Sequence, residues 1–155
     1  MKRLFKQTFL FCSLIFSAAI YSQDYKIAGG LFVDLGTGTT AFGPHAKFFV
    51  NENFSVQPAV LFMEGGGTAI GADLSYNSRI SGAPGLMWNV GAGPQVFLYS
   101  GNTSVALRPS LGLEYTISGA PLNIFFDWRP LLEFTNGTDF TAGRFGLGAR
   151  FVFKK

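Results

Sequence analysis

The segment PLNIFFDWRPLLEF, residues 121–134, decides the fold class because apolar and charged side chains alternate along it. Successive side chains of an extended strand point to opposite faces. One face would therefore carry Phe126 and Trp128, and the other would carry Asp127 and Arg129. Since an unpaired charge in an apolar core costs many kcal/mol, the two faces of this strand must meet different surroundings.

The same alternation recurs along the chain, and no window after Tyr25 shows a sustained helical period. Short segments rich in Gly, Asn, Asp and Pro separate the alternating windows, as is typical of turns. Eight successive antiparallel strands leave two open edges, which closure into an up-and-down barrel removes. The predicted strands cover residues 25–35, 43–50, 54–62, 69–77, 86–99, 105–117, 122–134 and 142–153.

The two faces of these strands differ in every window. The apolar face, which begins with Tyr25, holds no charge and includes aromatic residues that we expect to face lipid: Tyr76, Trp88, Tyr115, Phe126, Trp128, Phe151 and Phe153. The other face holds glycines and a polar set that we expect to fill the lumen as a network: Lys26, His45, Lys47, Gln57, Arg108, Glu114, Asp127, Arg129, Glu133, Arg144 and Arg150.

A soluble lipocalin-like barrel would turn the apolar face inward. Eight strands enclose too little space for so many large side chains, and the glycines of the polar face fit a crowded lumen better than an open surface. The pattern therefore predicts an all-β fold, an eight-stranded antiparallel up-and-down transmembrane β-barrel that is apolar outside and polar inside.

Five prolines lie within the strand windows, all on the apolar parity. Proline cannot donate a ladder hydrogen bond, so we expect bulges or strand ends at these positions. They are Pro44, Pro58, Pro94, Pro109 and Pro130.

Residues 1–22 have the pattern of a cleavable signal peptide, with a basic head, an apolar stretch and small residues near the end. The apolar stretch falls short of the roughly 20 residues that span a bilayer as a helix. Cleavage would leave residues 23–155 as the barrel, with nine basic residues (twelve less the three of the head) facing nine acidic ones. This neutral balance removes the support for a nucleic-acid partner.

Four motifs stand out in the second half: LMWNVGAGPQVFLY (86–99), VALRPSLGLEYTI with the turn SGAP (105–121), PLNIFFDWRP (121–130) and GRFGLGARFVF (143–153). They are similar to the small outer-membrane β-barrels common in Bacteroidota, which are related in architecture to OmpX and the OmpA membrane domain. The resemblance implies a monomeric barrel in the cell outer membrane, in contact with its lipids and inserted by the barrel-insertion machinery. Phe153 fits the terminal aromatic residue which that machinery reads, although Lys154 and Lys155 follow it.

The lumenal charges permit two interpretations. Paired ions can fill a narrow lumen as a structural network, with Asp127 and Arg150 as one possible pair, or they can line a path for ions or protons. We expect the structural network, because eight-stranded barrels are generally filled by side chains. A narrow pore for ions or small solutes is the alternative.

Catalytic chemistry has little support in the sequence. His45, the one histidine, is followed two positions later by Lys47 and not by the serine of the lipid A deacylase pattern. Cys12 would leave with the signal peptide, and neither a metal-ligand cluster nor a phosphate-binding loop is present. We therefore expect a structural or interaction role, in membrane integrity, surface contact or a larger complex with another outer-membrane protein. We expect no enzyme and no cofactor. A lipid-modifying enzyme is the second alternative.

Overall fold

The computed structural model describes residues 25–135 and 137–154; the predicted signal peptide, residues 1–22, lies outside them. Among the described residues, none forms a helix long and apolar enough to cross a membrane. The strands are β1 (Ile27–Gly36), β2 (Ala41–Phe49), β3 (Phe54–Met63), β4 (Thr68–Arg79), β5 (Leu86–Tyr99), β6 (Asn102–Thr116), β7 (Leu122–Trp128), β8 (Leu131–Glu133), β9 (Asp139–Thr141) and β10 (Arg144–Lys154).

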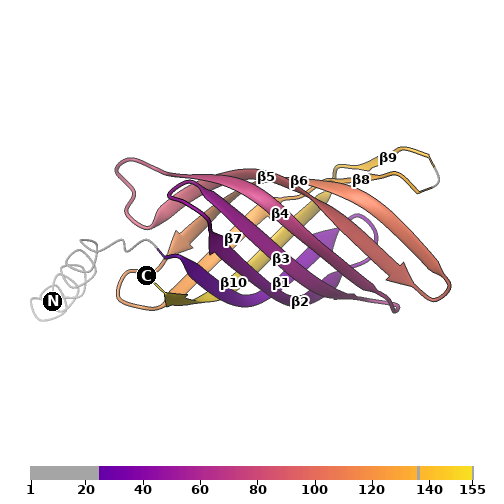
Figure 1. The fold of residues 1–155 in the computed structure, drawn as a ribbon, viewed down its shortest axis with the longest axis horizontal. Coiled ribbons are helices and arrows are strands. Elements are labelled where there is room, and N and C mark those ends of the chain that lie inside the picture. The colour runs from indigo at the N-terminus through magenta and orange to yellow at the C-terminus, as the bar shows by residue number, and fades with distance from the viewer. Residues whose placement is uncertain (1–24, 136, 155) are drawn as a thin grey trace, which may run out of the picture.

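The strands form one closed antiparallel barrel (Figure 1). β1 pairs with both β2 and β10, and β6 pairs with both β5 and β7, so the sheet closes on itself. β7 with β8 forms the seventh crossing and β9 with β10 the eighth, which confirms the predicted eight-stranded antiparallel barrel. We call the end where β1 begins and β10 finishes the terminal end, and the opposite end the loop end.

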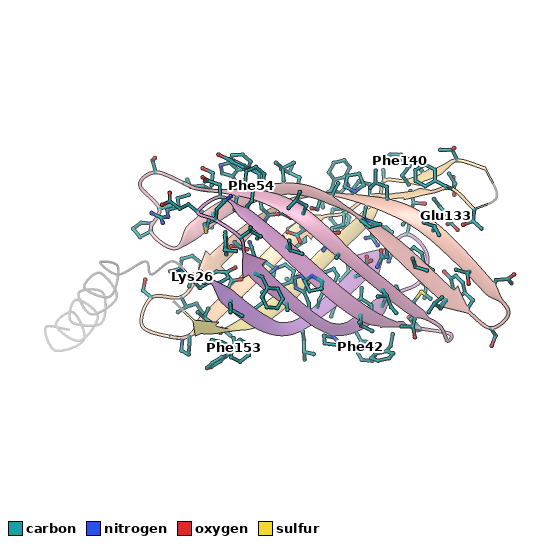
Figure 2. The ribbon with its side chains drawn as sticks, viewed as in Figure 1. Lys26, Phe42, Phe54, Glu133, Phe140 and Phe153 are labelled. Atoms are coloured by element: carbon teal, nitrogen blue, oxygen red, sulfur yellow. The ribbon has the colours of Figure 1, made fainter. Side chains whose placement is uncertain are left out.

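Burial alternates along the strands as the sequence predicts. In β7 the exposed residues Ile124, Phe126 and Trp128 alternate with the buried residues Phe125 and Asp127. Figure 2 shows the apolar side chains projecting from the outside of the wall, among them Phe42, Phe54 and Phe153. On this outer face the predicted aromatic residues are exposed, except that Trp88 is half-buried: Tyr76, Tyr115, Phe126, Trp128, Phe151 and Phe153.

The two residues that precede β1 do not follow the predicted alternation of faces. Tyr25 is buried and Lys26 is exposed, the reverse of the expectation that Tyr25 faces lipid and Lys26 joins the lumenal network. The register of β1 against β10 shifts between Ile27 and Ala28. The shift skips Phe153 of β10, and Ile27 keeps its regular partner Phe48 on β2, so it does not exchange the faces of β1. Tyr25 and Lys26 precede β1, and the chain bends at Lys26, so the alternation of an extended strand does not apply to them.

The expectation of bulges or strand ends is wrong for four of the five prolines. Each of the four lies inside a strand and keeps a partner on one neighbouring strand without a register shift. A strand residue directs its N–H toward only one neighbour, so pairing with the other neighbour survives. The pairs are Pro44 with Leu31, Pro58 with Ala72, Pro94 with Leu107 and Pro109 with Ala92.

The fifth proline, Pro130, breaks the seventh crossing between β7 and β8. The indole of Trp128, just before the break, donates from Nε1 to the carbonyl oxygen of Ala142 at 2.7 Å. Ala142 lies in the matching break between β9 and β10. The outward-facing indole thus links the two breaks, at a carbonyl oxygen that also accepts from the Arg144 N–H at 3.0 Å.

Replacing this indole tests the bond directly. Trp128→Phe keeps an aromatic ring but removes the donor, so we expect the free energy of unfolding to fall by about 1 kcal/mol. The measurement is urea unfolding of the refolded protein in lipid vesicles. Trp88→Phe is the matched control, since the described residues give the Trp88 indole no acceptor; equal losses in the two variants would contradict the role of the Trp128 bond.

Candidate functional site

The lumen near the terminal end is organised around Glu114 of β6. Its Oε2 accepts from Lys47 Nζ at 2.6 Å and from Arg150 Nη1 at 3.0 Å, and its Oε1 accepts from the Tyr25 hydroxyl at 3.0 Å. We call Tyr25, Lys47, Glu114 and Arg150 the Glu114 cluster. Lys47, Glu114 and Arg150 are almost fully buried, so this carboxylate is the principal compensation for two cations.

Neighbouring polar side chains complete the hydrogen bonding of the two cations. Lys47 donates to Asn77 Oδ1 at 2.6 Å. Arg150 donates to Asn123 Oδ1 at 3.0 Å, Gln57 Oε1 at 2.9 Å and His45 Nδ1 at 3.2 Å. Buried ions are tolerated when both charge and hydrogen bonds are satisfied in this way.

Tyr25 closes the Glu114 cluster toward the terminal end. Burial, and next the nearby Glu114 carboxylate, raise the pKa of the Tyr25 phenol well above its usual value of 10.0. The hydroxyl therefore remains protonated at neutral pH and remains a donor to Glu114.

A second group of ions, the Asp34 cluster, comprises Asp34, Arg108 and Arg144. Asp34 Oδ2 accepts from Arg108 Nη1 at 2.7 Å, and Asp34 Oδ1 accepts from Arg144 Nη2 at 2.8 Å. Arg108 also donates to Gln95 Oε1 at 2.6 Å and to the Arg129 carbonyl oxygen at 2.9 Å. Arg144 donates further to the carbonyl oxygens of loop residues 37 and 39, which ties this cluster to the loop end.

Arg129 forms a third set of ionic contacts. Its guanidinium pairs with Asp73 and lies 3.7 Å from Asp127 Oδ2. The possible pairing of Asp127 with Arg150 is wrong, because the ion-pair partner of Arg150 is Glu114.

An aromatic layer lies between the Glu114 and Asp34 clusters. The ring of His45 lies 5.3 Å from that of Phe32 and 5.2 Å from that of Phe125, between ring centroids. The guanidinium of Arg150 lies 3.8 Å from the Phe125 centroid, and that of Arg129 lies 5.0 Å from the Phe32 centroid. The Phe125 ring thus contacts a cation of the Glu114 cluster, and the Phe32 ring contacts Arg129 of the third set. Such contacts stabilise buried guanidinium groups.

Apolar residues fill the lumen nearer the loop end. Leu61 and Met63 of β3 pack with Ala69 of β4 and Phe97 of β5, and Leu131 of β8 joins them. Glu133, predicted to belong to the lumenal network, is half-buried and binds the Ser104 hydroxyl. The lumen is therefore occupied by side chains from the Glu114 cluster to this apolar layer.

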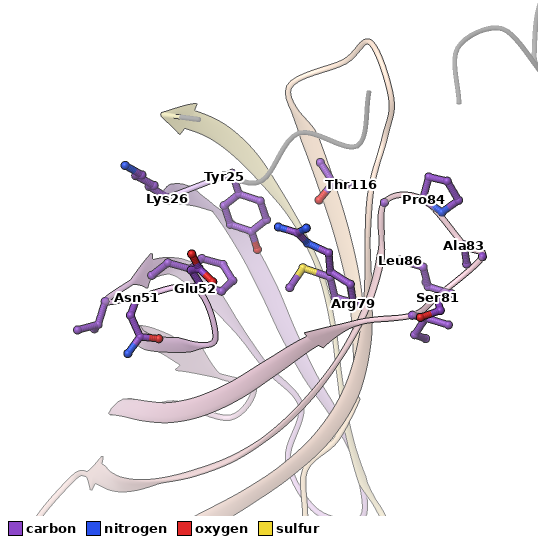
Figure 3. Close-up of a pocket in the computed structure, with 16 residues that line it drawn as sticks. Tyr25, Lys26, Asn51, Glu52, Arg79, Ser81, Ala83, Pro84, Leu86 and Thr116 are labelled. Carbon is purple, nitrogen blue, oxygen red and sulfur yellow. The ribbon is translucent and has the colours of Figure 1, made fainter. Parts of the chain in front are cut away.

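The terminal end opens instead into a cavity of about 950 Å³ (Figure 3). We call this cavity the vestibule. It lies between the β2–β3 and β4–β5 turns, with Tyr25 and Thr116 on its lining. Lys26 also lines it and is exposed, so this lysine belongs to the barrel mouth and not to the buried network.

The remaining predicted network residues face the lumen. The prediction omits Asp34 and Asp73, although both share the inward parity, and it places Tyr25 on the wrong face. Within residues 25–135 and 137–154, no group of His, Cys, Asp and Glu is arranged to hold a metal ion. The residues of the predicted network that are buried in the lumen are His45, Lys47, Gln57, Arg108, Glu114, Asp127, Arg129, Arg144 and Arg150.

Comparison with known proteins places the fold. No protein-family model and no curated protein sequence matches the chain. The N-terminal β-barrel domain of Pseudomonas aeruginosa OprF is similar in structure, with a TM-score of 0.68 and 15% identity over 84% of this chain and 100% of that one. Neisserial surface protein A (NspA) has a TM-score of 0.57 and 14% identity over 82% of this chain and 96% of that one. The chain therefore has the fold of the eight-stranded outer-membrane β-barrels.

Proposed function

We propose that this protein is an integral β-barrel of the bacterial outer membrane, with a structural or interaction role and a closed lumen. The large apolar residues on its outer face support a lipid environment, since a closed barrel satisfies its backbone within the wall and needs an apolar exterior to span a membrane. The resemblance to Bacteroidota barrels and the signal-like pattern of residues 1–22 support export to that membrane.

One observation carries the closed lumen: Lys47, Glu114 and Arg150 meet inside it, near the terminal end, with at most 1% of each side chain exposed. Ions moving through a pore need a hydrated path, and these three side chains exclude water from the contact. The vestibule is open to solvent, but it ends where Tyr25 binds Glu114. The arrangement favours a filled barrel over the narrow pore.

The orientation follows from the proposed export route. The terminal end would face the periplasm, and the loop end, with its apolar layer and short connections, would face the outside. Phe153 would be the residue that the insertion machinery reads, and outer-membrane lipids would cover the aromatic residues. The role would lie in membrane integrity, in surface contact or in a larger complex. In the last case, one side of the apolar exterior would dock on another outer-membrane protein.

Fractionation and electrophoresis test the membrane assignment. We expect the protein in the outer-membrane fraction, with a mobility on gels that changes when the sample is boiled, because closed barrels resist detergent until heated. Recovery from the soluble periplasm with one mobility before and after boiling would exclude the membrane barrel and support the lipocalin-like alternative.

Planar-bilayer recording tests the closed lumen separately. We expect no steady conductance from the refolded full mature chain. Reproducible unitary currents would instead establish the narrow pore.

Lipid A from a deletion strain should be unchanged; an altered lipid A that the restored gene reverses would support a lipid-modifying enzyme.

A further inference from the structure

A small internal cavity lies beside the aromatic layer. The centre of a water molecule can occupy about 10 Å³ within it, which is enough room for one water molecule. Five of its eight lining residues are polar or charged, and the lining comes from five of the eight crossings and from the break after β7. The lining residues are Phe32, Gln57, Ala59, Gly71, Asp73, Gln95, Arg108 and Arg129.

Arg108, which lines this cavity, has one donor that no described residue uses. Its Nη1 donates to Asp34 and Gln95, and its Nη2 donates to the Arg129 carbonyl oxygen. Its Nε is buried and has no partner among residues 25–135 and 137–154. A buried N–H without an acceptor is costly, most of all on a charged group, so an acceptor in the cavity would stabilise the barrel.

Hydrogen-bond acceptors for a bound molecule also line the cavity. Asp73 contributes a carboxylate, and Gln57 and Gln95 contribute amide groups. A buried water typically forms about three hydrogen bonds to polar groups that the protein leaves incompletely paired. The charges that surround the cavity include both signs, Arg108 and Arg129 with Asp73 and Asp34, so neither a cation nor an anion is favoured over a neutral molecule.

We propose that this cavity is a binding site for one resident water molecule, which accepts from Arg108 Nε and donates to the carboxylate or amide oxygens around it. Gln57 belongs to the hydrogen bonds of Arg150, and Gln95 belongs to those of Arg108. The water therefore joins the Glu114 cluster to the Asp34 cluster, next to Phe32 of the aromatic layer. One continuous hydrogen-bonded network then runs from Tyr25 to the loop end.

The test is oxygen-17 magnetic relaxation dispersion of the full mature chain refolded in detergent micelles. We expect the wild type to show the contribution of a slowly exchanging water, and Ala59→Val to lose it, because the added methyl groups fill the cavity. Ala149→Val is the matched control: Ala149 lies on the exposed outer face, so the contribution should remain. The same signal in the wild type and Ala59→Val would overturn the proposal.

A crystal structure at a resolution that shows ordered water decides the matter if Ala59→Val does not fold. Density within hydrogen-bonding distance of Arg108 Nε is the expected result. A map in which Arg108 is well ordered and the cavity holds no density would overturn the proposal. Neither experiment depends on conductance, so a barrel shown to conduct would reject the closed lumen without deciding the water site.

Discussion

Phe126→Arg is expected to prevent most of the protein from inserting into lipid vesicles. Phe126 is 51% exposed on the outer face and lies between Leu113 of β6 and Leu147 of β10 in the sheet. Its ring stacks on that of Phe145, with centroids 5.9 Å apart. A cationic side chain on this surface would face hydrocarbon at a cost of about 2 to 4 kcal/mol near the bilayer midplane.

The measurement is the fraction of refolded protein with heat-modifiable mobility after mixing with vesicles. Phe126→Leu is the matched control, since it changes the size of the side chain without adding charge, and it should insert as the wild type does. Insertion of Phe126→Arg at the wild-type level would show that this face of β7 does not contact lipid.

The faces of the strands could be predicted because the backbone of a strand dictates them. In residues 121–134 the side chains of Phe126 and Trp128 point outward, and that of Asp127 points inward, as the alternation requires. The same periodicity locates Phe32 and Phe125 in the lumen, because they share the parity of Asp34 and Asp127. That two phenylalanines pack against a histidine there depends on the barrel's closure, which the alternation does not specify.

The two residues that precede β1 could not be placed by alternation. Tyr25 and Lys26 fit the predicted pattern as well as any other pair, but the chain bends at Lys26, before β1 begins, and the alternation ends there. The consequence is chemical: the Glu114 cluster gains a phenol in place of an ammonium group.

The ion pairs could not be predicted, because register and cross-lumen distance select them. Asp127 and Arg150 lie on adjacent strands, yet Gly146 is the residue opposite Asp127, and Asn123 is the residue opposite Arg150. Glu114 instead meets Lys47 from the far side of the lumen, 67 positions away in sequence. Parity selects which charges enter the lumen, and the geometry of the closed wall selects their partners.

Glu114→Gln should therefore cost far more stability than its small change in shape implies. It leaves Lys47 and Arg150, both almost fully buried, without the carboxylate that they share. Breaking a buried ion pair by removing one partner costs about 3 to 5 kcal/mol, since a charge remains uncompensated in the interior. Urea unfolding in lipid vesicles measures the loss, with Asp127→Asn as the matched control: the Asp127 ion contact is longer, at 3.7 Å, and its loss should be smaller.

A double-mutant cycle separates the shared charge from general damage to the lumen. Lys47→Met removes one of the two cations, so the combination with Glu114→Gln leaves Arg150 as the single unmatched charge at this carboxyl position. We expect the double variant to lose less stability than the sum of the two single losses, because the two side chains contact each other directly at 2.6 Å. Strictly additive losses would show that Lys47 and Glu114 stabilise the barrel independently, and the carboxylate would then not be the centre of the lumenal network.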